Sequence, residues 1–225
     1  DNGSTDGTKD YLKSLTDPRV VVLLAGQNQG MVTNWQRCLQ HAKGRYFLLM
    51  SDDDALASDD ALSKLVAGFS SPSSDAIGVV FSSVLLERPT EKFISRTKYN
   101  SKLANTEDFI VDFYNGKVSA FPCATMLRTS DLKQIGGYVG WGAEYGVDAC
   151  VWISIALGYG KVKYIDEPLA LYRMHNSLSS SSVNVAIQDL EAIQELLLKQ
   201  RAQISTLGYE RIMAAISGAK AKVPL

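Results

Sequence analysis

The residues in this sequence best suited to chemistry are three consecutive carboxylates, Asp52, Asp53 and Asp54. Adjacent carboxylates repel one another unless a positive charge lies among them. Mg²⁺ and Mn²⁺ favour carboxylate oxygens and often bridge to the phosphates of a substrate. The three residues therefore predict a divalent-cation site, and the alternative is a solvated acidic turn that caps the next helix.

The stretch before these carboxylates must position them. Tyr46–Met50 is a continuous apolar run that is too short for a helix, and Lys43-Gly44 bounds it. Such a run predicts a strand buried on both faces, as in a parallel sheet. Open α/β sheets bind ligands at the carboxyl ends of their parallel strands. We therefore expect an inner strand that presents Asp52–Asp54 to a pocket.

Further strands and helices are predicted from apolar spacing. Val20–Leu24 and Ala76–Leu86 have the composition of strands, as do Lys161–Ile165 and Leu169–Arg173, whereas Met31–Ala42 has helical spacing.

Two more helices are predicted in the second half of the chain, over Val147–Leu157 and, with an amphipathic pattern, over Val185–Ile204. The expected organisation is one α/β domain over residues 1–182, and a C-terminal helical extension over residues 183–225 that packs on the same domain.

Composition limits the classes of function. A chain of 225 residues with 46% hydrophobic content can bury a substantial core, and its formal net charge of -1 gives no reason to expect nucleic acid as a partner. Cys38, Cys123 and Cys150 are too widely spaced for a metal pattern, which favours reduced, buried thiols. No apolar run reaches the roughly 18 residues of a membrane span. We expect a cytoplasmic protein, with peripheral association at the inner face of the membrane left open.

Several short motifs, taken together in this order, resemble those of the family-2 glycosyltransferases of GT-A fold. The matching segments are Asp1–Thr8, Asn28–Gly30, Ala42–Tyr46, Ser51–Asp54, Gly136–Tyr138, Val147-Asp148 with Trp152, and Tyr172–His175. The resemblance implies an α/β fold with a mixed, mainly parallel sheet flanked by helices. In the family a strand, a helix and a second strand precede the Asp-Asn-Gly-Ser run, so we expect this chain to lack them.

The resemblance also implies an activity. Such enzymes move a sugar from a nucleotide-diphosphate donor to an acceptor hydroxyl and invert the anomeric centre, usually in the assembly of bacterial polysaccharides or glycoconjugates. The acceptor would be a sugar or a lipid-linked sugar. Mn²⁺ or Mg²⁺ would neutralise the pyrophosphate leaving group.

Residue roles follow from the same resemblance. Nucleotide-sugar binding is expected at Asp1, Asn28, Gly30, Asp52 and Asp53. The metal ligands are expected to be Asp53, Asp54 and His175. Ser51 stands where many family members have their first Asp, so the sequence leaves open which of the three carboxylates binds the metal.

Asp148 matches the family's general base, which takes the proton of the acceptor hydroxyl. The alternative for Asp148 is a charge that stabilises a helix N-terminus. Trp152 lies one turn later on the same helix face, where its ring could stack on a sugar or shield the base. Trp141 and Tyr145, in a glycine-rich segment, are weaker candidates for the acceptor site.

Two other functions compete with this interpretation. A nucleotidyltransferase also combines a Rossmann-like sheet with acidic metal ligands, although no basic, glycine-rich triphosphate loop is visible. A degenerate transferase domain could bind sugar without catalysis. The presence of both Asp148 and the carboxylate cluster favours the enzyme.

Overall fold

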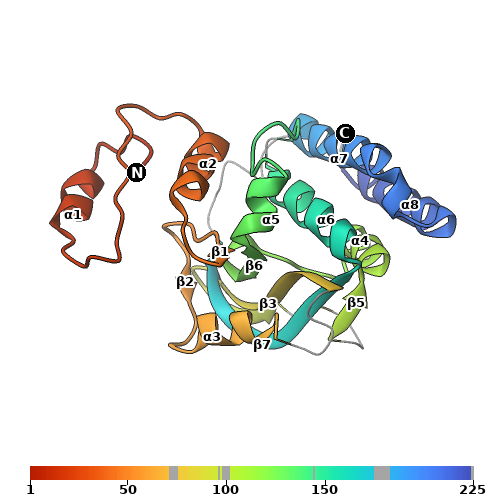
Figure 1. Cartoon of the computed structure of the whole chain (residues 1–225), viewed down its shortest axis with the longest axis horizontal. Coiled ribbons are helices and arrows are strands. Elements are labelled where there is room, and N and C mark those ends of the chain that lie inside the picture. Colours follow the sequence, from red (N-terminus) through yellow and green to blue (C-terminus); the bar gives the residue numbers. More distant parts are fainter. Residues whose placement is uncertain (71–75, 96, 98–101, 144, 175–182, 224–225) are drawn as a thin grey trace.

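The computed structural model describes residues 1–70, 76–95, 97, 102–143, 145–174 and 183–223. In the described chain, seven strands form one sheet in the order β1-β6-β3-β7-β2, with β4 paired to β3 and β5 paired to β7 (Figure 1). The strands are β1 (Tyr46–Leu48), β2 (Ala55–Leu56), β3 (Ile77–Glu87), β4 (Lys92–Ser95), β5 (Leu103–Asn105), β6 (Thr125–Arg128) and β7 (Lys161–Arg173).

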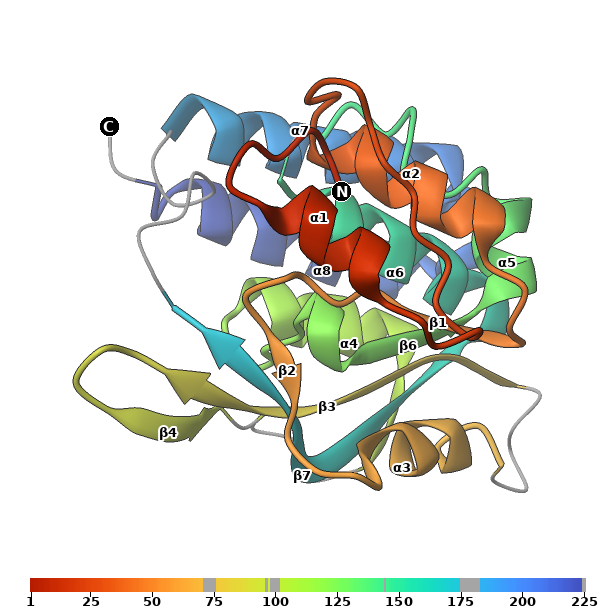
Figure 2. The same cartoon turned by 90° about the vertical axis from the view of Figure 1, so that its left-hand side faces the viewer.

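Helices cover both faces of this sheet. The α-helices are α1 (Thr8–Ser14), α2 (Met31–His41), α3 (Ala61–Ala67), α4 (Thr106–Tyr114), α5 (Thr129–Gln134), α6 (Val147–Tyr159), α7 (Val183–Lys199) and α8 (Thr206–Lys220); Pro122–Ala124 and Arg201–Gln203 form short 3₁₀ turns. Figures 1 and 2 show α4, α5, α6, α7 and α8 stacked on one face, with α3 beneath the other. The α/β class with a mixed sheet flanked by helices is therefore confirmed.

The long central strand β3 is buried on both faces. Its Val79 and Phe81 belong to the main core with the helical layer, whereas Val80 packs with Leu65 of α3 on the opposite side. This alternation follows from the two-residue period of a strand. Because both faces are covered, the strand needs apolar residues at successive positions, which is the pattern that predicted it.

α6 lies at the centre of the helical layer. It is apolar on all sides, and ten of its 13 residues are buried, as expected of a helix surrounded by other elements. α7 packs against it through the stripe Ala192, Ile193, Leu196 and Leu197. The helices α7 and α8 thus share the main core with the sheet. The division between residues 182 and 183 stays a prediction, because residues 175–182 lie outside the described chain.

The expectation of an inner, parallel strand at Tyr46–Met50 is wrong. Among the described strands β1 pairs with β6 alone, antiparallel and at the edge of the sheet, and Tyr46 and Leu48 are only half-buried. The expected mainly parallel sheet is wrong too, because in the same part of the chain only β3 and β7 pair in parallel, and the other five strand pairs are antiparallel. A continuous apolar run indicates how much of a strand is covered, but not the direction of its neighbour.

The strand expected over Val20–Leu24 is also absent from the described structure. Val20, Val21 and Leu24 are exposed, and α1 buries none of its residues. Figure 1 shows this N-terminal segment to one side of the α/β body, beyond α2. β-branched residues favour a strand only where a neighbouring strand completes the hydrogen-bond ladder.

Two further expectations concern the surface. Cys123 and Cys150 are buried, but Cys38 is exposed on α2, so its predicted burial is wrong. Within the described chain, no helix has both the length and the hydropathy that a membrane span requires.

Candidate active site

The carboxylate cluster lies beside the end of β7. The backbone N–H of Arg173 donates to Oδ1 of Asp54 at 3.2 Å, and the Arg173 guanidinium donates to the backbone carbonyl of Asp53 at 2.6 Å. The same guanidinium donates to Glu87 Oε2 at 3.0 Å. Glu87 and Arg173 are paired at the ends of the parallel strands β3 and β7. Arg173 therefore holds the acidic loop at the carboxyl ends of the two parallel strands, where ligands bind in open α/β sheets.

Asp54 is a half-buried carboxyl with a perturbed pKa. Burial raises its pKa, the neighbouring charge of Asp53 raises it further, and hydrogen bonds from the Arg173 backbone and the Cys123 thiol oppose this rise. Burial and the Asp54 charge in turn raise the pKa of Cys123 well above the usual range for a thiol. Asp52 is exposed. A half-buried carboxyl with a raised pKa gains from any cation that approaches it.

The chemistry of these groups fits a hard divalent cation. Mg²⁺ is commonly bound by one or two protein carboxylates together with substrate phosphates, and Asp53 and Asp54 are two such carboxylates. Within the described residues no group of three or more His, Cys, Asp or Glu side chains could hold a metal ion. His175, predicted as a further ligand, lies outside the described residues.

Asp148 occupies the first turn of α6. Burial, with a smaller contribution from the charge of Asp189 on α7, raises its pKa to about 7. A hydrogen bond of 2.7 Å from the Ala149 backbone N–H to its Oδ1 acts in the opposite direction. A carboxyl with a pKa near 7 can both take and release a proton at neutral pH.

Tyr172, on β7, links the two acidic sites. Burial is the main cause of its raised pKa, and the charges of Asp54, Asp53 and Asp148 raise it further. One phenol is therefore within electrostatic reach of all three carboxylates. The structure thus brings Asp148 into the same region as Asp53 and Asp54, although about 94 residues separate them in the chain.

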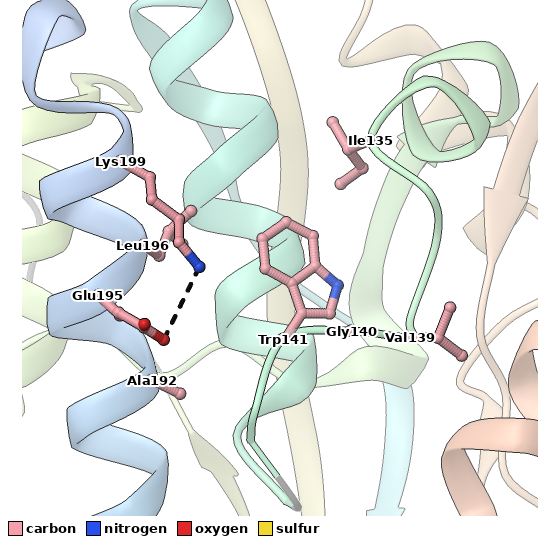
Figure 3. Close-up of a pocket in the computed structure, with 8 residues that line it drawn as sticks. All are labelled: Ile135, Val139, Gly140, Trp141, Ala192, Glu195, Leu196 and Lys199. Atoms are coloured by element: carbon pink, nitrogen blue, oxygen red, sulfur yellow. Dashed lines mark ion pairs between the residues drawn. The ribbon is translucent and has the colours of Figure 1, made fainter.

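The predicted acceptor residues have different environments. Trp152 is only 3% exposed within the main core, so its expected stacking on a sugar is wrong, because every side of α6 is covered. The Trp141 indole donates to the Gly137 carbonyl at 2.8 Å and, with Leu196 of α7, lines a cavity of about 210 Å³ (Figure 3). Tyr145 is half-buried in the same glycine-rich segment.

The predicted nucleotide-binding residues of the first 30 positions form a cluster of their own. The Asn2 amide donates to Asn28 Oδ1 at 2.8 Å and to the Gly30 carbonyl at 3.2 Å. The Asp1 carboxylate accepts the backbone N–H groups of residues 3 and 4. Gly3 has a φ of +90°, and a Cβ there would lie 2.7 Å from the Asn28 nitrogen. The structure thus brings Asp1, Asn28 and Gly30 together, whereas Asp53 and Asp54 bond to β7.

Sequence reasoning missed three residues of this region: Tyr172, Cys123 and Asp189. Tyr172 lies in a segment that resembles the family, but the resemblance implies no role for it. The spacing of Cys123 from the other cysteines indicates only a buried thiol. Asp189 did leave a signal, because it lies three and four residues before Ala192 and Ile193 and so brings a charge to the buried face of α7.

Comparisons with known proteins identify a family and related folds. The model of "Glycosyl transferase family 2" matches residues 1–135. TuaG of Bacillus subtilis (strain 168), assigned to teichuronic acid biosynthesis as a glycosyltransferase, is 28% identical over 195 residues, which cover 83% of this chain and 70% of TuaG.

Solved structures show the fold. S. aureus TarS in complex with UDP-GlcNAc superposes with a TM-score of 0.60 at 14% identity, over 99% of this chain and 71% of that one. A mannosyltransferase of Pyrobaculum calidifontis in complex with GDP-Man and Mn²⁺ gives a TM-score of 0.54 at 17% identity, over 100% of this chain and 65% of that one.

Proposed function

The chain belongs to glycosyl transferase family 2, and we propose that Asp148 acts as the base of its transfer reaction while Asp53 and Asp54 serve the diphosphate end of the donor. It is an enzyme that moves a sugar from a nucleotide-sugar donor to an acceptor. Family membership therefore removes the nucleotidyltransferase alternative. A domain without catalysis is the remaining competitor, and the experiments below distinguish the two.

The setting that we propose is the assembly of a cell-surface polysaccharide. TuaG is assigned to teichuronic acid biosynthesis, and the solved structures hold UDP-GlcNAc or GDP-Man. These ligands share a nucleoside diphosphate joined to a sugar, and we extend that class of donor to this chain. A lipid-linked sugar acceptor would bring the enzyme to a membrane surface.

The reaction is a single displacement with inversion. The acceptor oxygen attacks the anomeric carbon, the bond from that carbon to the phosphate oxygen breaks, and the nucleoside diphosphate leaves. The acceptor hydroxyl gives its proton to the Asp148 carboxylate. The pKa of about 7 makes Asp148 a stronger base than an exposed aspartate while leaving a large ionised fraction at neutral pH.

The surroundings of Asp148 support this role. Trp152 and Tyr138 are each 3% exposed, and the charge of Asp148 raises the pKa of Tyr138. We assign to these two rings the exclusion of water from one side of the carboxylate, since Trp152 lies one turn after Asp148 on α6 and the Asp148 charge reaches Tyr138. Excluding water strengthens the electrostatic interactions of an active site and limits hydrolysis of the donor.

The donor end of the site is the carboxylate cluster. Asp53 and Asp54, with His175 and the donor phosphates, would hold Mn²⁺ or Mg²⁺, and the ion would neutralise charge on the leaving diphosphate. Arg173 orients this loop through its bonds to Asp53 and Asp54. We assign contacts with the nucleotide to Asp52 and to the cluster of Asp1, Asn28 and Gly30.

The acceptor side is proposed at the glycine-rich segment that leads into α6. Trp141 and Tyr145 precede Asp148 in the chain by seven and three residues, and both are only partly buried. Their rings could pack on a sugar ring, although the Trp141 N–H is already bonded within its own loop.

The observation that carries the proposal is that Arg173 holds Asp53 and Asp54 at the carboxyl ends of β3 and β7, next to Tyr172, whose phenol also responds to the charge of Asp148. Displacement requires the base and the diphosphate site within one substrate length. The test is a thermal-shift screen of nucleoside diphosphates with and without Mn²⁺, followed by transfer assays with the matching sugar donors. Ligand binding to the folded state alone must raise the melting temperature. A chain that binds a donor with Mn²⁺ but transfers no sugar to any acceptor or to water would support the domain without catalysis.

A further inference from the structure

The start of α6 contacts a second acid. The backbone N–H of Gly146, the residue before α6, donates to Oδ2 of Asp189 at 2.8 Å. Asp189 lies one turn before Ala192 and Ile193, which are buried against the core that contains α6. Residues three and four apart share a helix face, so the Asp189 carboxylate lies on the side of α7 that faces α6.

The same turn of α7 also holds the loop that leads into α6. The Gln188 amide donates to the Gly142 carbonyl at 3.1 Å, one residue before the Asp189 contact in the chain. A Cβ on Gly146 would lie 2.9 Å from the Asp189 Cβ. The backbone at the start of α6 and the Asp189 side chain are therefore packed as closely as glycine allows.

Asp189 and Asp148 act on the same neighbours. Burial is the main cause of the raised pKa values of Tyr114 on α4 and of Cys150 on α6, the latter to about 12, and the charges of both acids raise them in addition. The titratable groups whose pKa the Asp148 charge raises come from α4, α6, β7 and the loop after α5, and they are Tyr114, Cys150, Tyr172 and Tyr138. The two carboxylates thus face one region between α4, α6 and α7.

We infer that Asp189 is a positioning residue for Asp148, because it fixes the backbone at the start of α6 and places a second negative charge beside the base. This inference rests on the proposed function. A like charge disfavours the ionised form of its neighbour, so Asp189 strengthens Asp148 as a proton acceptor. Helix α7 of the C-terminal region then contributes to the active site.

The experiment separates the charge of Asp189 from its hydrogen bond. Asp189→Asn removes the charge, while its amide oxygen can still accept the Gly146 N–H. Gly146→Ala keeps the charge but displaces the Asp189 side chain. Glu191→Gln is the matched control, because it removes one charge from the same helix at an exposed ion pair with Lys220. Two quantities are measured on each protein: the Asp148 titration midpoint, by carbon NMR of the carboxyls assigned with Asp148→Asn, and the pH profile of sugar transfer.

We expect the Asp148 midpoint to fall by at least about half a unit in Asp189→Asn and to fall in Gly146→Ala, but to stay in place in Glu191→Gln. The fall of kcat/KM at low pH should shift by the same amount as the Asp148 midpoint. At one pH unit below the parental midpoint, kcat/KM of Asp189→Asn, as a fraction of its own pH-independent value, should therefore be about threefold higher than that of the parent.

A parental midpoint and pH profile in Asp189→Asn would overturn the inference, even if the melting temperature fell, because capping of the α6 backbone alone would explain that result. Failure of the proposed function has a different signature. If Asp148→Asn transfers sugar at the parental rate, Asp148 is not the base, but the NMR midpoint still decides whether Asp189 acts on Asp148.

Discussion

The carboxyls of Asp54 and Asp148 both have raised pKa values, and burial is the largest cause in both. Their surroundings differ. Asp54 is beside Arg173, whose backbone N–H and positive charge favour the ionised form. The Asp148 charge reaches the phenols of Tyr114, Tyr138 and Tyr172, and its charged neighbour is another acid, Asp189.

This difference shows how one residue type can take two roles in one site. Asp54, whose ionised form the Arg173 backbone N–H and charge favour, is suited to hold a cation. Asp148 is held close to the point of protonation and is suited to exchange a proton. Environments that separate the pKa values of two carboxyls are a recurring way to separate such roles.

The strongest test of this contrast is Asp148→Asn, which keeps the size of the side chain but cannot take a proton. We expect sugar transfer to fall at least about a hundredfold, since a positioned general base is worth about 10²–10⁴-fold. Donor affinity should stay within about twofold, because the base acts mainly in the transition state. Transfer rates and donor dissociation constants of the two proteins check this prediction. Asp60→Asn, at the exposed start of α3, is the control for an acid at a helix start.

The second test is Asp54→Asn. If Asp54 holds the cation, Mn²⁺-dependent affinity for the nucleoside diphosphate should fall at least about tenfold, as loss of a group that supports a metal usually does. Calorimetric titration with and without Mn²⁺ measures this, and Asp59→Asn, at an exposed carboxylate after β2 that has no assigned role, is the control. Equal Mn²⁺-dependent affinity in the parent and the Asp54 variant would remove Asp54 from the metal site.

The third test uses stability. The Asp148 carboxyl has a pKa of about 7 in the folded protein and about 3.9 when unfolded. Between pH 3.9 and pH 7, roughly, it keeps its proton only in the folded state. Because the folded state then binds more protons, its stability falls as the pH rises from about 4 to about 7. Asp148→Asn lacks this loss, so its free energy of unfolding should exceed that of the parent by at least about 1 kcal/mol at pH 8.

Urea unfolding at pH 4, 6 and 8 checks this prediction, and the gain of the variant should grow with pH and level off above about pH 7. A small loss of stability, roughly 0.3–1 kcal/mol at every pH above 5, would instead mean that Asp148 only stabilises the start of α6.

The smallest expected effect is in the N-terminal cluster. Asn28→Ala removes an exposed acceptor that binds Asn2 and the Gly30 N–H. Net hydrogen bonds of this kind are worth about 0.5–1.5 kcal/mol, so we expect donor affinity to fall about threefold, with or without Mn²⁺. A larger loss in Asn28→Ala than in Asp54→Asn would reverse our ranking of the two clusters.

The spacing of apolar residues correctly predicted elements that bury a defined surface. Helices were expected over Met31–Ala42 and Val147–Leu157, and the structure has Met31–His41 and Val147–Tyr159. The strand expected over Ala76–Leu86 is Ile77–Glu87. In each, the period of the apolar residues matches the surface that the element buries.

The spacing of apolar residues gave wrong predictions where a neighbouring strand decides whether, and over what length, a strand forms. Val20–Leu24 has the residues of a strand but forms none in the described chain. The two strands expected over Lys161–Ile165 and Leu169–Arg173 are one strand, β7, because β3 supplies a ladder along the whole length, with register shifts between Ser82 and Val84. Sequence spacing carries no information about such distant neighbours.

The candidate site was predicted to a similar extent. Motifs point to Asp53, Asp54 and Asp148 as candidates, whereas the burial and neighbouring charges that raise the pKa of Asp54 and Asp148 depend on the folded structure. The contact between Asp189 and Gly146 joins residues 43 positions apart, and no local pattern predicts it. The prediction that Trp152 stacks on a sugar is wrong because the sequence shows the aromatic ring but not the elements that cover it.

The parallel pairing of β3 with β7 has a consequence for synthesis on the ribosome. Ile77 pairs with Lys161 and Glu87 with Arg173. One edge of β3 therefore has no partner strand until more than 70 further residues have emerged from the ribosome. At about 5–20 residues per second, that interval lasts several seconds, during which the nascent chain exposes one of its most apolar strands. Distant pairings of this kind also fold slowly. We therefore expect chains interrupted before β7 to aggregate or to be held by chaperones, even though β4 and β6 are already available as partners for β3.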